Sequence, residues 1–473
     1  MTYENSLTSI DHNGRRVLLV SYHFPPVGGA GVQRPVKFAK YLPDFGWEAS
    51  ALVAENPSVP VFDHSLCADL PDDLVIERAR TWEPGYALKR QVAASAGGRR
   101  SPLGWLKRQL RGAARRAAGL ALQPDAQILW VPNALRAAAR LLRKTPHDAI
   151  LATAPPYSNL LLGCLLKRRF GLPLIVDYRD EWDLSSRYLE NSQRDWFSQF
   201  VQGRMQRWVL QQADVIVATT RNSARRLEDR ARQAGGRARA HCIYNGYDPA
   251  DFAGAADFAE PAHEPAIESS RSGRFRLVYT GTLWNLTSVE PLVQAVELLE
   301  RHDPQMLDRL ELVFVGRKTP EQQVLLDRLR ATRASIVCED YCDHSRALTL
   351  MCEADALLVL LSAVEGAERV VTAKLFEYLA ARKPLLAVVP QGETAEIVNR
   401  FLARGHYLPA DVRGIANWLV AAASNLPGSS DPPYRREAPD VSTFSRPSQA
   451  GELAELLNSV CRRRPVPALV PVA

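Results

Sequence analysis

The hydrophobic positions of this chain form short continuous runs that alternate with helical patterns. Residues 16–24 (RVLLVSYHF) and 47–55 (WEASALVAE) are apolar and rich in branched side chains, which is typical of strands buried in a parallel sheet. Between them, the segment 27–47 begins with glycines and continues as a helical pattern that ends near Gly46. This order of strand, glycine loop, helix and strand predicts a βαβ unit.

The same succession extends along the chain and then begins again. In the first half we predict a helix at 196–211 and further strands at 149–153, 172–178 and 214–219. In the second half we predict strands at 275–282, 310–316, 356–362 and 384–390, with helices at 289–300, 321–330, 345–353 and 372–381. The sequence therefore predicts one architecture twice, at the level of fold.

The 473 residues exceed the usual size of one domain, so we expect two. We predict an N-terminal doubly wound domain at 1–250, a Pro- and Ala-rich linker at 251–272 and a C-terminal doubly wound domain at 273–440. Residues 441–473 contain an amphipathic helix, which we expect to return to the N-terminal domain, and a loose tail. The predicted fold class is α/β, with two such domains facing each other across a cleft.

Composition narrows the class of protein. A hydrophobic fraction of 46% with 23% charged residues is ordinary for a globular protein and excludes a wholly disordered chain. No apolar run reaches the ~18–20 residues that a membrane span needs, and the first residues are too polar for a secretory signal. Seven scattered cysteines indicate reduced thiols, so we expect a cytoplasmic protein without a metal site.

The net charge of +7 is confined to one segment. Residues 84–124 hold nine basic and no acidic side chains, which leaves 50 basic and 52 acidic residues elsewhere, a net charge of −2. This distribution argues against a nucleic-acid partner for the fold as a whole. Within the segment, residues 99–122 place Leu and Ala on one helical face and Lys and Arg on the other. Such a helix favours an anionic membrane surface, and the alternative is a helix docked on its own domain.

Two glycine turns mark the expected ligand site. Gly29 and Gly31 follow the first strand, and Gly281 and Thr282 follow the first strand of the second domain. Glycine allows a close approach of the backbone to a ligand, and ligands of doubly wound sheets lie beyond the carboxyl ends of the strands. Arg34 stands where the third glycine of a dinucleotide-binding motif would be, which argues against a dinucleotide cofactor.

The opening PPVGGAGVQRPVKFAKYL resembles that of the retaining glycosyltransferases of the family 4 type, which have the GT-B fold of two Rossmann-like domains. Further stretches are similar to this family over roughly residues 15–460: LIVDYRDEWD (174–183), IYNGYDPADF (243–252), YCDHSRALTLMCEADALLVLLS (341–362) and AKLFEYLAARKPLLAV (373–388). The resemblance implies transfer of a sugar from a nucleotide-diphosphate sugar with retention at the anomeric carbon. It also implies no essential metal or cofactor, and a glycan or polyprenyl-linked acceptor at the inner face of the membrane.

The resemblance also suggests site residues. Glu377 would hold the donor ribose and Lys374, on the same helical face, would approach the diphosphate. Gly29, Gly31, Gly281, Thr282, Arg317 and Tyr341 complete the expected donor site. The family has a glutamate eight residues before Glu377, where this chain has Arg369, so Glu365 and Glu368 are the alternative carboxylates.

Arg179 and Asp180 follow a buried strand at its carboxyl end. As a functional pair they would orient the acceptor hydroxyl or contact phosphate, and otherwise they would form a structural salt bridge. His23 is the proton carrier nearest to the first glycine turn and is more often structural in such a position.

Other functions remain compatible with these patterns. Within the same fold, the chain would be a nucleotide-sugar epimerase or a phosphorylase. In a different class, it would be a non-enzymatic basic protein that binds nucleic acid or acidic lipid through residues 84–124.

Overall fold

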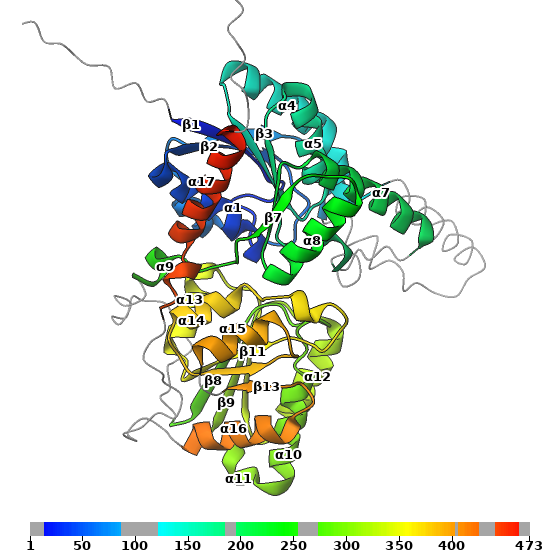
Figure 1. The fold of residues 1–473 in the computed structure, drawn as a ribbon. Helices are drawn as coiled ribbons and strands as arrows, with labels where there is room; N and C mark the ends of the chain where they lie inside the picture. Colours follow the sequence, from blue (N-terminus) through cyan, green and yellow to red (C-terminus); the bar gives the residue numbers. More distant parts are fainter. Residues whose placement is uncertain are drawn as a thin grey trace, which may run out of the picture.

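The computed structural model describes residues 14–86, 122–184, 195–253, 273–402, 405–424 and 440–462. The chain forms two α/β domains, the upper and the lower half of Figure 1, and each is built on a parallel sheet. This confirms the predicted fold class.

The N-terminal sheet has seven parallel strands in the order β3-β2-β1-β4-β5-β6-β7. Their bounds are β1 Arg15–Val20, β2 Trp47–Ala54, β3 Val75–Ala79, β4 Ala149–Ala154, β5 Leu174–Tyr178, β6 Val215–Ala218 and β7 Arg239–Cys242. The strand order reverses between β1 and β4, so their carboxyl ends form the crevice where doubly wound sheets bind ligands.

Successive side chains of β1 supply two separate hydrophobic cores, one on each face of this sheet. Leu18 and Val20 face one core, and Val17 and Leu19 face the other. Among the described residues of the domain, the helices are α1 Ala30–Tyr41, α4 Val131–Lys144, α5 Ser158–Phe170, α7 Trp196–Gln212, α8 Arg221–Gln233 and α9 Pro249–Ala253, with short 3₁₀ helices η1 Leu42–Phe45, η2 His64–Asp69 and η4 Ala126–Trp130.

The C-terminal sheet has six parallel strands in the order β10-β9-β8-β11-β12-β13. The strands are β8 Phe275–Thr280, β9 Leu310–Val315, β10 Ser335–Glu339, β11 Ala356–Leu360, β12 Leu385–Val388 and β13 His406–Tyr407. The helices are α10 Glu290–His302, α11 Pro304–Leu307, α12 Pro320–Arg330, α13 His344–Glu353, α14 Lys374–Ala380, α15 Glu393–Phe401 and α16 Val412–Ser424, with η6 Ala367–Arg369 and η7 Ser442–Phe444.

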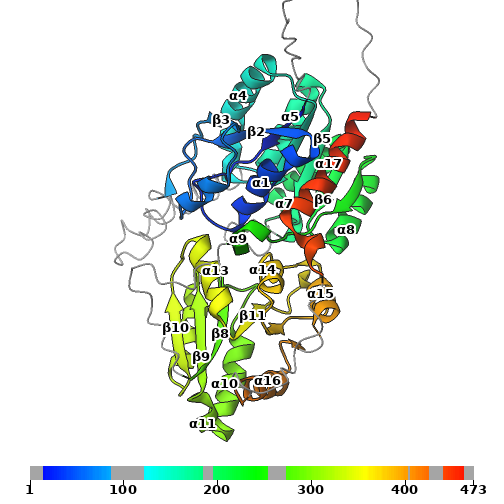
Figure 2. The ribbon, with the colours of Figure 1, turned by 90° about the vertical axis from the view of Figure 1, so that its left-hand side faces the viewer.

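The last helix of the described residues, α17 (Arg446–Arg462), returns to the N-terminal domain. Figures 1 and 2 show it beside α1, away from the lower sheet. Its buried Leu453 and Leu457 join the core that contains Val17 and Trp47, and Trp47 donates a hydrogen bond to Asn458 at 3.2 Å. Helix α17 therefore belongs to the first domain, and the chain crosses between the domains just before it.

The central strands appear where the sequence predicts them, whereas the outer strands β3, β7, β10 and β13 were not predicted. The reason is their burial: β7 alternates between exposed and half-buried positions, and every residue of β10 is half-buried. An edge strand covered on fewer sides carries a weaker apolar pattern.

Two predicted features fall on residues outside the described ranges. The basic segment 84–124 lies largely within 87–121, and the linker lies largely within 254–272. Among the described helices, none combines the length and the apolar composition that a membrane crossing requires.

Candidate active site

The first glycine turn lies at the carboxyl end of β1. Gly29, the N-cap of α1, has a φ of 106°, a conformation that only glycine adopts without strain. Gly31 is in the first turn of the helix, and a methyl group there would lie 2.8 Å from Nη1 of Arg179. Gly29 is therefore required for its backbone conformation, and Gly31 is required because a side chain there would collide with Arg179.

Arg34 is the residue that replaces the third glycine of a dinucleotide-binding turn. It is fully buried and donates hydrogen bonds to both carboxylate oxygens of Asp177 on β5, at 2.9–3.1 Å. It also donates to the carbonyl oxygen of Tyr244 at 2.8 Å. Arg34 thus connects α1 to β5, the strand that Arg179 and Asp180 directly follow, and it holds the glycine turn in place.

Arg179 directs its guanidinium toward main-chain carbonyls. It donates to the carbonyl oxygen of Ala154 at 3.3 Å and to those of Gly31 and Pro155. Burial lowers its pKa, against the opposing effect of nearby carboxylates. The Asp180 carboxylate is exposed toward the cleft but closely surrounded by protein, so desolvation raises its pKa while the charge of Arg179 opposes the shift.

The second glycine turn lies at the carboxyl end of β8, opposite the first. Gly281 has a φ of 136°, and a side chain there would collide with the amine end of Lys374. Helix α14, which begins at Lys374, is fixed over this turn because the hydroxyl of buried Tyr378 accepts a hydrogen bond from the Thr280 amide at 2.9 Å. Burial lowers the pKa of Lys374, and Glu377 opposes that shift.

Two neighbouring pockets open between the domains. The first, which we call the α13 pocket, has about 920 Å³ of space that includes open solvent. Of the predicted residues it is lined by Gly29, Gly281, Thr282, Arg317, Tyr341, Lys374 and Glu377. The second, the β5 pocket, has about 1050 Å³ of space, again including open solvent, and is lined by Gly31, Arg179, Asp180, Thr282 and Lys374 among the predicted residues. Thr282, Ala373 and Lys374 line both, so the two pockets meet at the start of α14.

The α13 pocket is bounded by both domains. The hydroxyl of Tyr341 donates to the Asp63 carboxylate of the N-terminal domain at 3.4 Å. Burial, together with the charge of Asp63, raises the pKa of Tyr341 to about 12, so the phenol remains a hydrogen-bond donor at neutral pH.

Several lining residues were not predicted from the sequence. Gln33, Asp63, His344 and Arg446 line the α13 pocket, and Asn245 and Trp284 line the β5 pocket. Arg446 is the first residue of α17 and is 5% exposed, with its guanidinium bonded to Gln449 at 3.0 Å. Only the return of α17 across the cleft brings Arg446 there. For His344, the histidine within the quoted stretch 341–362 was a signal available in the sequence.

The two alternative carboxylates lie elsewhere. Neither Glu365 nor Glu368 is among the residues that line the two pockets, and both side chains are exposed. Glu368 accepts a hydrogen bond from its neighbour Arg369 at 2.6 Å. A role for either carboxylate at the donor sugar stays a prediction.

His23 is half-buried near Arg179, and no partner for its buried Nδ1 is found within the described residues. Desolvation, aided by the charge of Arg179, lowers the pKa of His23 to about 3. The ring is therefore neutral at physiological pH, and it lines neither pocket.

A cluster of three carboxylates beside the site is paired with the ammonium group of Lys37. The carboxylates of Asp69, Asp248 and Asp251 lie close enough together to suit a metal ion. The buried ammonium of Lys37 contacts all three, at 2.7, 2.6 and 2.8 Å. These contacts neutralise part of the cluster and fix α9 against α1, and Asp251 in turn accepts from His344 at 3.1 Å.

Residues 28–246 match the family model described as the glycosyl transferase 4-like domain. The match begins at the first glycine turn and ends just before α9, so it covers the described N-terminal domain from α1 to β7. No protein in the curated collection matches the chain in sequence at a significant level.

Solved structures extend the comparison to the whole chain. Anabaena HepE, crystallised with UDP-glucose, is 14% identical with a TM-score of 0.54, over 94% of this chain and 99% of that one. A UDP-forming α,α-trehalose-phosphate synthase from Burkholderia vietnamiensis is 14% identical with a TM-score of 0.54, over 95% and 98%. The N-terminal domain of Candida albicans trehalose-6-phosphate phosphatase reaches a TM-score of 0.59 at 14% identity, over 94% and 97%.

These likenesses show the fold across both domains, and the matched model covers the first of them. The glycine turns and the cleft between the sheets stand where this fold binds its ligands. The chain therefore has the two-domain GT-B fold, and its residues 28–246 match the glycosyl transferase 4-like domain.

Proposed function

We propose that this enzyme transfers a sugar from a nucleotide-diphosphate sugar to a hydroxyl of a glycan or lipid-linked acceptor, with retention at the anomeric carbon and without a metal or other cofactor. The observation that carries the proposal is the junction of the two pockets at Lys374. A nucleotide sugar whose diphosphate lies at this junction would place its nucleoside in one pocket and its sugar in the other.

The α13 pocket suits the nucleoside. Glu377 offers a carboxylate that accepts charge-assisted hydrogen bonds from ribose hydroxyls, and Arg317 and Tyr341 offer donors and a flat surface for the base. HepE was crystallised with UDP-glucose, which makes a uridine nucleotide the first donor to test.

The β5 pocket suits the reacting sugar and the acceptor. Lys374 and Arg179 line it from opposite domains, and cations there stabilise the charge of the departing diphosphate in the role that a metal would otherwise fill. For retention, the acceptor oxygen forms the new bond to the anomeric carbon on the same face of the sugar from which the diphosphate oxygen departs, as the bond to that oxygen breaks. The leaving oxygen takes the electron pair, and Asp180, whose raised pKa suits a general base, takes the hydroxyl proton.

The first experiment is a thermal-shift panel of nucleoside diphosphates and their sugars. A ligand at a hundred times its dissociation constant adds ~2.7 kcal/mol of stability. The stabilising nucleotide sugar is then incubated with candidate acceptors while release of nucleoside diphosphate is measured, and the anomeric configuration of the product is read by NMR. Inversion would refute retention, and turnover that stops with a chelator would refute metal independence. A product in which only the sugar is isomerised would favour the epimerase alternative.

We also propose that the enzyme works at the inner face of the cell membrane, with the basic segment 84–124 on anionic lipid. This proposal is based on the sequence, which concentrates nine basic residues in that segment of an otherwise slightly acidic chain. A surface location would bring the cleft close to a lipid-linked acceptor.

A further inference from the structure

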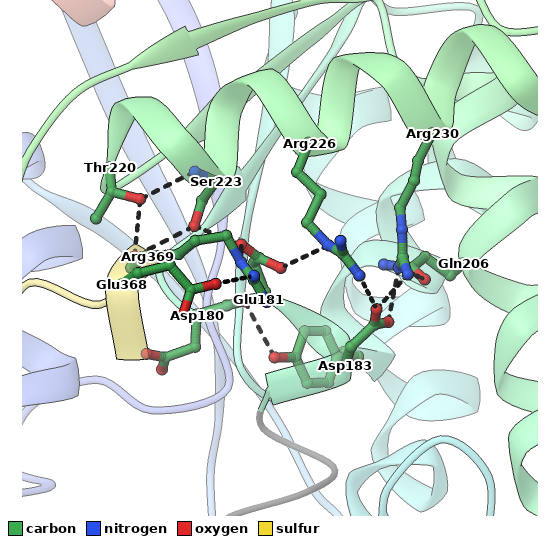
Figure 3. A network of polar contacts seen from close by, with 11 residues as sticks. Asp180, Glu181, Asp183, Gln206, Thr220, Ser223, Arg226, Arg230, Glu368 and Arg369 are labelled. Carbon is green, nitrogen blue, oxygen red and sulfur yellow. Dashed lines mark hydrogen bonds and ion pairs between the residues drawn. The ribbon is translucent and has the colours of Figure 1, made fainter. Parts of the chain in front are cut away.

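The loop between β11 and α14 contacts the N-terminal domain at the start of α8. Within this loop, Arg369 of η6 donates from Nε to the Glu181 carboxylate of the N-terminal domain at 2.9 Å. The two side chains are 18% and 4% exposed. Ser223 and Arg226 of α8 also contact the Glu181 carboxylate, at 2.6 and 3.3 Å. Figure 3 shows these side chains around Glu181. A largely desolvated ion pair therefore joins the two domains.

Main-chain groups reinforce this contact. The hydroxyl of Thr220 donates to the carbonyl oxygen of Arg369 at 3.0 Å, and the side-chain Nδ2 of Asn222 donates to the carbonyl oxygen of Glu368 at 3.5 Å. The backbone of η6 is thus held by the N-terminal turn of α8, and the Arg369 side chain is held by Glu181. We call the Arg369–Glu181 pair with these bonds the interdomain clasp.

A carboxylate of the C-terminal domain also binds the N-terminal end of α8. Glu393, at the start of α15, is almost fully buried and accepts from the amides of Arg221 and Asn222 at 2.7 and 3.0 Å. These amides are among the first of α8, where a negative charge is favoured by the helix dipole. The helix end is therefore held between η6 and α15.

The clasp lies against the β5 pocket. Asp180, one residue before Glu181, lines that pocket from one domain, and Val370, one residue after Arg369, lines it from the other. Because each clasp residue is bonded to a lining residue, separation of the pair would move opposite walls of the pocket apart.

The clasp also accounts for the departure from the family pattern. The glycosyltransferase resemblance implies a glutamate at position 369, and the arginine found there turns toward the other domain. Its guanidinium meets a buried carboxylate, which would keep Arg226 but lose its shorter ion pair if Arg369 were removed.

We propose that Arg369 and Glu181 are positioning residues, which hold the domains in the arrangement that forms the β5 pocket around the transferred sugar. The proposal deepens the proposed function and rests on it. It assigns no contact with the substrate to either residue. Their removal would therefore slow the transfer step, whereas nucleotide binding in the α13 pocket would change little.

The kinetic test compares Arg369→Gln with Arg369→Lys and with a control, Arg333→Gln, which removes an exposed ion pair to Asp308 within the C-terminal domain. Misplaced catalytic groups reduce turnover by about a hundredfold per ångström. We expect kcat to fall about 10- to 100-fold in Arg369→Gln. The affinity for UDP should change less than about threefold, and lysine should restore part of the rate. A fall in UDP affinity as large as the fall in kcat, or unchanged kcat, would overturn the positioning role.

A double-mutant cycle tests whether the two residues act as one unit. If they do, Glu181→Gln/Arg369→Gln should be no slower than the slower single variant. Losses that multiply would show that the two residues act separately and would overturn the clasp as the cause.

Hydrogen exchange tests the clasp without any activity. In Arg369→Gln, peptides covering 220–224 and 366–371 should exchange at least about tenfold faster, while exchange in the Arg333→Gln control stays at the wild-type rate. Equal exchange in Arg369→Gln and wild type would overturn the clasp. Faster exchange, together with a wild type that consumes no nucleotide sugar, would confirm the contact but overturn the proposed function, and with it the positioning role.

Discussion

We expect that Gly31→Ala impairs turnover without impairing stability. Gly31 lies in helix α1, where the backbone conformation suits any residue. The new methyl group would lie 2.8 Å from Nη1 of Arg179, well inside the ~3.5–4.0 Å at which such atoms attract. The guanidinium must therefore move away from the turn, out of the position set by the carbonyls of Ala154 and Pro155.

The size of the effect follows from the displacement. Restoring an ordinary contact requires a shift of about 1 Å, and a misplacement of that size costs about a hundredfold in rate. This corresponds to about 2.7 kcal/mol of transition-state stabilisation. Stability should hold, because alanine in a helix is favoured over glycine by about 1 kcal/mol, which offsets the local strain.

The assay is kcat with the donor found by thermal shift, measured beside the melting temperature. Gly235→Ala is the matched control, because Gly235 has a φ of 81° and no atom within 4 Å of the added methyl group. It should lower stability by about 1 kcal/mol and leave turnover unchanged. If Gly31→Ala melts normally and keeps its turnover within about twofold, Arg179 does not act in the reaction as its geometry implies.

Three further predictions concern the donor, the acidic cluster and the membrane. Glu377→Ala should lose ~1.5–3 kcal/mol of nucleotide-sugar binding by calorimetry with an unchanged melting curve. The pKa of Asp248 is lowered to about 2, since bonds from Lys37 and Tyr41 outweigh desolvation, whereas its ordinary pKa is 3.8. Asp248→Asn should therefore lose about 2–3 kcal/mol of stability at neutral pH, measured by urea unfolding, and the difference from wild type should disappear as pH falls from about 4 through about 2. Replacing Arg108, Arg111, Arg115 and Arg116 with Gln should abolish sedimentation with anionic vesicles, whereas equal sedimentation would mean that residues 99–122 dock on their own domain.

Much of the site was predictable because it follows the strands. Arg179, Asp180, Gly281 and Thr282 come directly after buried strands, and the carboxyl ends of parallel strands meet at one edge of a sheet. Lys374 and Glu377 were placed through a resemblance, and both line the α13 pocket. Arg446 was not predictable, because no local pattern shows that α17 crosses the cleft.

The sequence by itself determined the two sheets, since continuous apolar runs such as those of β1, β5 and β11 are buried on both faces whatever surrounds them. It also determined the turns, where glycine alone tolerates the backbone. Only the tertiary structure decided what the charged side chains do. Arg34 and Arg369 look alike as exposed cations in a sequence, yet one meets Asp177 and the other meets Glu181 across the domain boundary. The physical reason is that an ion pair depends on which distant carboxylate lies within reach after folding. The hydrophobic periodicity of the sequence does not indicate which carboxylate this will be.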